Sequence, residues 1–344
     1  MSQCPFANLL DPDTYAHGMP YQMLKDMRET GPVLRMEDPL SGVPYWVVTR
    51  IVELDYVSKN PALFSSAEKS AFPMEADESM VEMHQNTIIN MDPPRHQKVR
   101  RVVRNAFTPK RVESYEPKFR EHARKIVDNV IARGECEFVE EVAAELPLIA
   151  ILELLGVPLE DRKKFFDWTN TMIFADDPDM ITSEEEGMLA SLEVIQYAMT
   201  IAARHREEPM DNITGALLDA EIDGEPMSED MFAWMFILIL VGGNESTRTV
   251  IAQGMRLLME NPDQLQYLVD NPDKIGDACE EILRYNTAFI SMRRTAMEDL
   301  ELGGQQISKG DKIILHYHMV NHDEHVFGED AMTFDVRRAE RMPD

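Results

Sequence analysis

The polar interruption of one long apolar segment limits most strongly how this chain can fold. Eleven consecutive apolar residues, 231–241, precede the sequence GGNESTR at residues 242–248, and apolar residues follow it. Ser228 is a suitable helix N-cap, and Asn261-Pro262 ends the pattern. Residues 229–260 are therefore predicted to form one helix. At about 1.5 Å per residue it would be about 48 Å long, enough to cross a domain through its centre.

The interruption is costly for a buried helix, so it calls for an explanation. Each glycine costs about 1 kcal/mol relative to alanine in a helix, and buried polar groups need partners. Gly242 and Gly243 would let another body approach the backbone closely. Glu245 and Ser246 supply an acid and a hydroxyl that could relay protons. The alternative is a kinked helix in which Glu245 pairs with Arg248 at i,i+3.

Composition excludes several classes of protein. The chain has 344 residues and a net charge of −28, which argues against general nucleic-acid binding and against docking on anionic lipid. Cys4, Cys136 and Cys279 are far apart, so neither a disulfide framework nor a zinc site is predicted. No apolar run is long enough to span a bilayer, and the N-terminus does not resemble a signal peptide. A cytoplasmic protein is predicted.

The pattern of apolar residues predicts a mainly α chain with a smaller β part near its two ends. The predicted helices are residues 20–29, 117–133, 138–155, 185–206, 229–260 and 272–286. The segments VPYWVVT and LELGGQQISKGDKIILHY are typical of strands and tight turns. We interpret residues 1–344 as a single domain, with β-rich parts near 1–65 and 287–344 and a helical part at 66–286.

A basic segment stands out in this acidic chain. Residues 95–111 contain seven Lys or Arg and no Asp or Glu. Asp92 and the following prolines are predicted to begin a helix, on which His96 and Arg100 share a face. That face could hold an anion, while Lys98 and Arg101 could contact an acidic partner. The alternative is a solvated basic surface.

Four shorter patterns complete the set of candidates. Glu281 and Arg284 form an i,i+3 pair within EEILRY, a spacing that is also common on helix surfaces. Arg294 precedes a predicted strand, and Arg338 follows Phe334-Asp335 in a predicted loop. The tract HYHMVNHDEH places four histidines close together. A metal site there is the less favoured interpretation, and a partly exposed strand face followed by a turn is the favoured one.

Taken in order, these patterns resemble the cytochrome P-450 family of heme-thiolate monooxygenases, of the bacterial type. The segments that carry the resemblance are DPPRHQKVRRVV, VGGNEST, EEILR, RRTAMEDLELGGQQISKGDKI and FDVRR, and they run through nearly the whole chain. The resemblance implies the cytochrome P-450 fold and the cofactor heme b (iron-protoporphyrin IX). It also implies a reaction that uses O2 and electrons from a redox partner.

The resemblance implies a role for each matching residue. His96, Arg100 and Arg294 would bind the heme propionates, and Gly242 and Gly243 would let heme and oxygen approach the helix. Glu245, Ser246 and Thr247 would form the catalytic proton relay, although the family usually has Thr at the position of Ser246. A serine keeps the hydroxyl but lacks the methyl group that helps to fix its rotamer. The residues implied as a structural network are Glu281, Arg284 and Arg338.

One departure concerns the iron ligand. In the family a Cys in a loop of the kind Phe-x-x-Gly-x-x-x-Cys follows the Phe-Asp-x-x-Arg loop, and its thiolate favours O–O cleavage. The sequence ends at Asp344, before such a loop, and none of the three cysteines is a convincing substitute. We therefore expect a C-terminally incomplete fold with no iron ligand within these residues, and no monooxygenase activity from these residues alone. The alternative functions are a catalytically incompetent fragment and a hydrophobic-ligand-binding protein of the same architecture.

The implied substrate is a lipophilic small molecule such as a sterol side chain, a branched lipid, an alkane or a terpenoid. By resemblance its pocket would include Ala288, Phe289 and Ile290, together with the Met-rich residues 71–90, the helices around 166–205 and the patch 234–246. Methionine adapts to irregular pockets, although Met-rich segments are more often ordinary core. By the same resemblance, the basic helix face is expected to bind an acidic ferredoxin.

Overall fold

The computed structural model describes residues 6–38, 41–173 and 183–342. The chain divides into two compact units. The first, here called the sheet unit, comprises Met1–Gln85, Ile89–Pro93 and Gln253–Asp344. The second, the helical unit, comprises Asn86–Ile88 and Pro94–Ala252. Each unit is described by itself.

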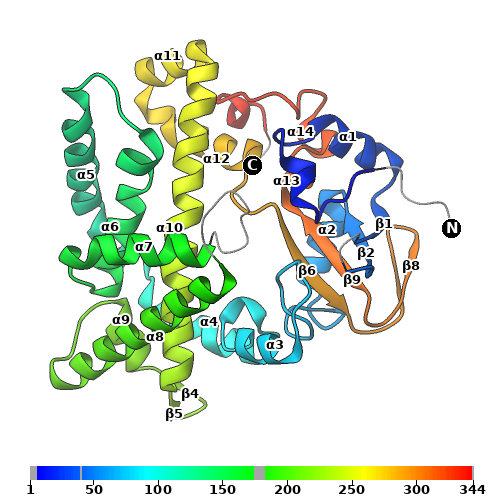
Figure 1. Cartoon of the computed structure of the whole chain (residues 1–344). Helices are drawn as coiled ribbons and strands as arrows, with labels where there is room; N and C mark the ends of the chain where they lie inside the picture. Colours follow the sequence, from blue (N-terminus) through cyan, green and yellow to red (C-terminus); the bar gives the residue numbers. More distant parts are fainter. Residues whose placement is uncertain (1–5, 39–40, 174–182, 343–344) are drawn as a thin grey trace. The chain divides into compact units, whose positions relative to one another are not determined.

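A five-stranded sheet organises the sheet unit (Figure 1). Its strand order is β1-β2-β9-β6-β3, and only the pairing of β2 with β9 is parallel among these strands. The bounds are β1 Val33–Glu37, β2 Pro44–Val48, β3 Phe64–Ser65, β6 Ser291–Ala296 and β9 Lys312–His316. Segments from the two ends of the sequence thus lie side by side in one sheet.

Apolar side chains cover both faces of the central strands. On one face Tyr45, Val47 and Ile314 pack with Leu24 and Met27 of helix α1. On the other face Trp46, Val48, Ile313 and Leu315 pack with Phe64 and neighbouring residues. Burial on both sides explains why these strands have nearly continuous apolar sequences rather than an alternation with polar residues.

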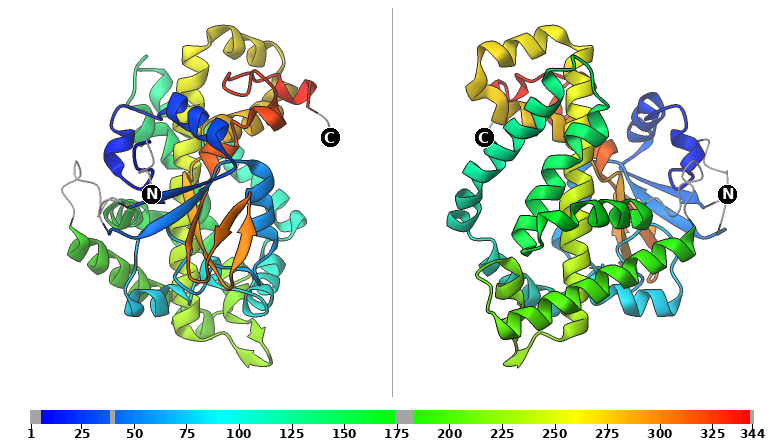
Figure 2. Two further views of the ribbon diagram at one scale, coloured as in Figure 1. Left: turned by 90° about the vertical axis from the view of Figure 1, so that its right-hand side faces the viewer. Right: turned by 60° about the vertical axis from the view of Figure 1, so that its left-hand side comes forward.

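A separate hairpin joins β7 Leu300–Leu302 to β8 Gln305–Ile307, and Figure 2 shows it in orange. Its two-residue turn is Gly303-Gly304, with φ angles of 57° and 78°. Positive φ at both positions is what a tight hairpin turn requires, and glycine adopts it without steric cost.

The helices of the sheet unit are mostly short. They are η1 Pro12–Tyr15, α1 Tyr21–Thr30, α2 Ile51–Lys59, α3 Glu78–His84, α11 Pro262–Asp270, η5 Pro272–Lys274, α12 Ile275–Tyr285, α13 Tyr317–Val320, α14 Glu324–Phe327 and η6 Arg338–Glu340. Of these, α12 carries Glu281 and Arg284 on its buried side.

The helical unit contains the longer helices. They are α4 Arg95–Ala106, α5 Pro109–Ile131, η3 Val139–Ala143, α6 Glu145–Leu155, η4 Leu159–Asp161, α7 Arg162–Ile173, α8 Glu184–Glu207, α9 Ile213–Leu218 and most of α10 Glu229–Glu260. The turn η2 Ile88–Asn90 lies at the change from one unit to the other. A two-stranded ribbon, β4 Glu221–Ile222 with β5 Glu225–Pro226, precedes α10. Helices α7 and α8 lie side by side (Figure 2).

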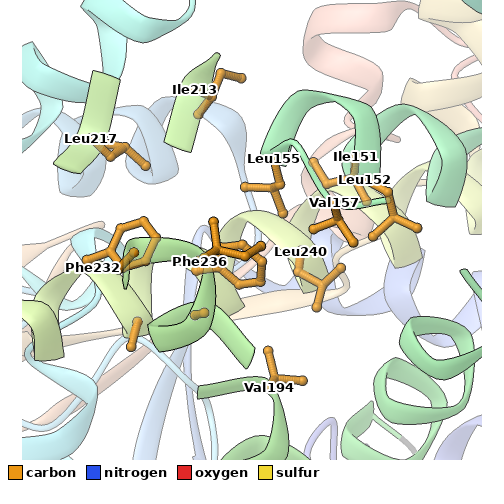
Figure 3. Packing of buried hydrophobic residues seen from close by; sticks show 14 of the residues in the cluster. Ile151, Leu152, Leu155, Val157, Val194, Ile213, Leu217, Phe232, Phe236 and Leu240 are labelled. Carbon is orange, nitrogen blue, oxygen red and sulfur yellow. The ribbon is translucent and has the colours of Figure 1, made fainter. Parts of the chain in front are cut away.

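One apolar cluster forms the core of the helical unit (Figure 3). Phe232, Phe236 and Leu240 of α10 contribute to it from successive turns, and Leu152 and Leu155 join it from α6. The spacing of the α10 residues at i, i+4 and i+8 puts them on one face of the helix. This core fixes the helix that carries Glu245.

The sequence predicted most long helices closely, but α5 begins at Pro109, eight residues before the predicted start at residue 117, with Thr108 as its N-cap. The helix at 229–260 is confirmed and runs without a break through GGNESTR, and the Ser228 hydroxyl accepts from the Met231 amide. The strand and turn pattern after residue 299 is also confirmed. The start of the basic helix was predicted wrongly. It begins at Arg95, and Asp92 instead accepts hydrogen bonds from the Ser65 hydroxyl and the Ser66 amide.

Candidate active site

The polar patch of α10 keeps its helical backbone because its side chains find partners nearby. The Ser246 hydroxyl donates to the Gly242 carbonyl oxygen one turn earlier, at 2.7 Å. This bond to the i−4 carbonyl fixes the hydroxyl proton and leaves the oxygen free to accept a further hydrogen bond. Thr247 lies next to Ser246 on an exposed position of the same turn.

Glu245 is subject to two opposing influences. Burial raises the pKa of its carboxyl group, and the ion pair and hydrogen bond with Arg248 lower it, but burial prevails. The structure contains the ion pair between Glu245 and Arg248 that the i,i+3 spacing allows, and both side chains are nearly buried. A raised pKa favours the protonated form of the carboxyl group, which is the form that a general acid uses.

A hydrogen-bonded network surrounds Glu245. The Asn244 side-chain amide donates to Glu245 Oε1 at 2.9 Å, and Arg248 Nη1 donates to Asn170 Oδ1 of α7 at 2.9 Å. Buried Asn244 also contacts the Thr169 hydroxyl at 3.4 Å. The Glu245 carboxyl group is thus held by Asn244 and Arg248 of the same helix, and these two residues are in turn held by α7.

The two glycines of the patch have different surroundings. A Cβ atom added to Gly242 would meet no heavy atom within 4 Å. A Cβ atom added to Gly243 would lie 2.7 Å from Ile151 Cδ1 of α6. The packing of α6 on α10 is thus a sufficient reason for glycine at position 243. Gly242 has the open space that close approach of a flat cofactor requires.

The basic helix α4 has one buried side and one exposed side. Val99 is buried, whereas Arg95, Arg100, Arg101 and Arg104 are exposed. His96, one turn before Arg100, is half-buried. Lys98 Nζ pairs with Asp223 at 2.6 Å, so one of the two cations expected to contact an acidic partner already has a partner within the unit.

In the sheet unit, Glu281 is shared by two buried arginines. Arg284 Nε and Nη2 donate to its two carboxylate oxygens at 2.7 and 2.9 Å. Arg338 Nε donates to the same oxygens at 3.1 and 3.2 Å. The Arg284 pair is bidentate, which is the strongest form of the interaction, whereas the single Nε of Arg338 is shared between both oxygens.

The other arginine nitrogens bind main-chain oxygens. Arg284 donates to carbonyl oxygens of Asn321, Ala331 and Thr333, and Arg338 also binds the Thr333 carbonyl oxygen at 2.8 Å. The network therefore joins α12 to the irregular chain between residues 321 and 338. Its donors and acceptors are used internally, which is the arrangement of a structural brace.

Arg294 lies on β6, where burial lowers the pKa of its guanidinium group. Its Nη1 donates to the Arg293 carbonyl oxygen at 2.7 Å, and Asp92 favours its charged form. A largely buried cation of this kind suits a carboxylate ligand. Ala288, Phe289 and Ile290 follow α12 directly, and Phe289 is 49% exposed.

Sequence reasoning missed Arg293, which has a different environment from Arg294. Successive residues of a strand point to opposite faces, so the second arginine of an Arg-Arg pair cannot share the surroundings of the first. Arg293 is buried, and it donates to Glu75 Oε1 at 3.1 Å. The two-residue period of a strand could have shown that Arg293 and Arg294 lie on opposite faces, but it could not have identified Glu75 as the partner of Arg293.

The histidine tract is more buried than predicted. His316, His318 and His322 are each 1% exposed, so the expectation of a partly exposed strand face was wrong. His318 and His322 instead stack with Tyr21 of α1. Among the described residues, no group of three or more His, Cys, Asp or Glu side chains could hold a metal ion. Cys136 and Cys279 are both exposed, and Cys4 lies outside the described residues.

The described residues fit heme at three kinds of position. In the helical unit, Gly242 offers open space beside a helix, Glu245 offers a carboxyl group with a raised pKa, and His96 and Arg100 offer donors that suit a propionate. In the sheet unit, Arg294 offers a largely buried guanidinium group for the same kind of ligand. No helix in the described parts of the chain has the length and hydropathy needed to cross a membrane.

Comparisons with known proteins agree with these features. The family model for cytochrome P450 matches residues 164–340. A steroid C26-monooxygenase of Rhodococcus jostii is 40% identical over 337 residues, which cover 95% of this chain and 70% of the relative. A methyl-branched lipid omega-hydroxylase of Mycobacterium bovis is 35% identical over 311 residues, covering 89% of this chain and 72% of the relative.

The fold also matches solved structures. A Mycobacterium marinum cytochrome P450 in complex with pseudoionone superimposes with a TM-score of 0.87 and 29% identity, covering 98% of this chain and 84% of that one. The mainly α fold with a smaller β part is confirmed, and heme b and monooxygenase activity follow from the family. The chain belongs to the cytochrome P450 family.

Proposed function

We propose that the enzyme hydroxylates a lipophilic molecule with a branched aliphatic end, such as a steroid side chain or a methyl-branched lipid. Its relatives with those two named activities support this substrate class. The structural observation that carries the proposal is Glu245, a carboxyl group with a raised pKa beside the Ser246 hydroxyl in the middle of α10. Heme, when bound, supplies the site at which O2 is activated.

Glu245 and Ser246 have the chemistry for proton delivery, and we assign them that role together with Thr247. Glu245 releases a proton and recovers it from solvent, and the hydroxyl groups pass it on. Ser246 already donates its proton to the Gly242 carbonyl oxygen. It must therefore rotate, or accept while it donates, to take part in a relay. Because Gly242 has no side chain, a flat ring can approach the helix backbone there. Gly243, the next residue, is assigned to the same surface.

His96, Arg100 and Arg294 are proposed to hold the heme propionates through charge-assisted hydrogen bonds. Arg294 has the clearest support, because its guanidinium group is largely buried and a carboxylate would compensate its charge. Glu281, Arg284 and Arg338 are assigned a structural role, since their polar groups are bound to one another and to the main chain.

The substrate surface is proposed to include Ala288, Phe289 and Ile290 and the Met-rich residues 71–90. Phe72 and Met74 in that segment are exposed apolar side chains, 38% and 54% accessible. Apolar groups at a surface are consistent with contact to a lipophilic molecule.

We infer that a ferredoxin delivers the electrons, and that the protein is cytoplasmic. Arg101, with the exposed arginines 95 and 104 of α4, forms a basic surface on a chain of net charge −28. A local reversal of charge of this kind attracts and orients an acidic protein. Lys98 contributes less to this surface because of its pair with Asp223.

A substrate titration tests the proposal. Steroids, methyl-branched fatty acids, n-alkanes and cyclic terpenes would be added separately to the heme-loaded protein, and the change in the heme absorption spectrum recorded. Saturable shifts with the steroids or branched lipids, and weaker ones with n-alkanes, are expected. Absence of a shift with all four classes would contradict the proposed substrate. Saturable binding without a hydroxylated product would favour the hydrophobic-ligand-binding alternative.

A further inference from the structure

Two buried cations of the sheet converge on one carboxylate from a loop. Arg293 on β6 and Lys312 on β9 project from the same face, because Thr295, two residues after Arg293, pairs with Lys312 in the register. Arg293 Nη1 and Lys312 Nζ both donate to Glu75 Oε1, at 3.1 and 2.9 Å. The two cationic side chains are 4% and 1% exposed, whereas that of Glu75 is 35% exposed.

Glu75 is ionised in this setting. Partial burial raises the pKa of its carboxyl group, but the hydrogen bond from Lys312 and the charge of Arg293 outweigh that effect and lower the pKa overall. Asp38 also favours the charged form of Lys312, though less strongly than Glu75 does. Glu75 is thus the principal counter-ion of both buried cations among the described residues.

The segment that carries Glu75 has few other attachments to the sheet. Residues 71–77 lie between β3 and α3 and contain neither helix nor strand. At their start the Arg293 amide donates to the Ala71 carbonyl oxygen at 2.7 Å, and the Ala71 amide donates to buried Asn90 at 2.6 Å. Four residues later, the Glu75 carboxylate provides the second attachment. Phe72 and Met74, both exposed, lie between these two points.

This arrangement links one carboxylate to the position of two apolar side chains. If Glu75 leaves its cations, the segment stays tied at Ala71 and at Asp77, which caps α3 by accepting from the Met80 amide, while the residues between these two points can move away from the sheet. The cations cannot follow, because both are buried on strands of the sheet. The carboxylate is accessible enough to be replaced by water, so opening is possible without unfolding of the sheet.

We propose that Glu75 is an ionic latch that holds residues 71–77 against strands β6 and β9, and that its release controls how fast substrate enters and leaves. Glu75 is in this sense a positioning residue, since it sets the place of Phe72 and Met74 and has no part in the chemistry. The second half of the inference rests on the proposed function, in which this segment contacts a lipophilic substrate.

Hydrogen–deuterium exchange of the heme-loaded protein tests the latch directly. In Glu75→Gln, the amides of residues 71–77 should exchange about threefold faster or more. The reason is that the variant loses the partly exposed ion pair that keeps this segment closed. The matched control is Glu68→Gln, the same change at an exposed position that also lies between β3 and α3. Equal exchange of this segment in the wild type and Glu75→Gln would overturn the latch.

A second variant separates the latch from general destabilisation, since Glu75→Gln leaves two buried cations without their main counter-ion. The triple variant Glu75→Gln, Arg293→Met, Lys312→Met removes those charges as well. Its melting temperature should recover towards the wild-type value, while exchange at 71–77 stays fast. A return of exchange to the wild-type rate would show that uncompensated charge, rather than a lost latch, was the cause.

Stopped-flow mixing with a substrate that shifts the heme spectrum tests the second half. Association and dissociation rates should both rise about threefold in Glu75→Gln, so that their ratio, the affinity, changes little. Unchanged rates despite faster exchange would overturn the link to substrate entry. If no lipophilic compound shifts the spectrum of the wild type, the proposed function fails, and the exchange measurement still decides whether the latch exists.

Discussion

At the scale of single residues, Glu245 is the proposed proton donor, and its neighbours set the pKa of its carboxyl group. Burial raises the pKa of its carboxyl group, even though Arg248 pairs with it. The sequence left two interpretations of Glu245 open, a proton-relay acid or an ion pair with Arg248, and the structure contains the ion pair. It could not predict which would prevail, since that depends on packing against α7, whose Asn170 takes one end of Arg248.

Replacement of Glu245 by Gln tests its role. Gln keeps an oxygen for the Asn244 amide but cannot release a proton, so kcat should fall about 100-fold or more, with a small change in KM. Steady-state product formation measures both constants. Glu260→Gln, an exposed position at the end of the same helix, is the control and should leave both unchanged. A normal kcat in Glu245→Gln would remove Glu245 from the proton relay.

At the scale of elements, the helix α12 is joined to the chain around residue 330 by one carboxylate and two guanidinium groups. The sequence indicated the three residues only through a family pattern, because the i,i+3 spacing of Glu281 and Arg284 is common on exposed helices and Arg338 lies in a distant segment. What distinguishes them is burial, which leaves Glu281 and Arg338 each 4% exposed. A contact across 57 residues cannot be read from local sequence.

Loss of the Glu281 charge should destabilise the fold strongly. In Glu281→Gln two buried arginines lose their shared counter-ion, and the free energy of unfolding should fall by about 3–5 kcal/mol. Urea denaturation measures this difference. The adjacent Glu280→Gln changes an exposed residue of the same helix and should have an effect of less than about 0.5 kcal/mol. Similar effects of the two substitutions would contradict the structural role of the network.

Contacts between residues far apart in the sequence explain why parts of the site could not be predicted. The ends of α10 and the Gly303-Gly304 turn depend on neighbouring residues, so local sequence was sufficient for them. Gly243 against Ile151, and Glu75 against Arg293, involve partners far away in the sequence. Nothing in the local pattern distinguishes Gly243, which packs on α6, from Gly242, which has open space.

At the scale of the whole molecule, buried histidines make the fold sensitive to acid. Burial lowers the pKa from 6.5 to about 4 for His316 and His322, and to about 2 for His318. Below about pH 6.5 the unfolded chain therefore binds protons that the folded chain does not. By linkage, the free energy of unfolding decreases as the pH falls from 6.5 towards 4.

His318→Phe should reduce this sensitivity. Its two ring nitrogens are buried and have no hydrogen-bond partner among the described residues, so an apolar ring should be tolerated at pH 7. At pH 5 the variant should be more stable than the wild type by about 2 kcal/mol, because it no longer has this group to protonate on unfolding. Urea denaturation at the two pH values measures the difference. His17→Phe, at an exposed position, should show no such change with pH.

The central claim is that the enzyme inserts one oxygen atom from O2 into a branched aliphatic end of a lipophilic substrate. Turnover of the heme-loaded protein with a ferredoxin reductant and isotopically labelled O2 tests it most directly, with mass spectrometry of the product. The account predicts a hydroxylated steroid side chain or methyl-branched lipid that carries one labelled oxygen atom. Consumption of the reductant without a labelled hydroxylated product would contradict it.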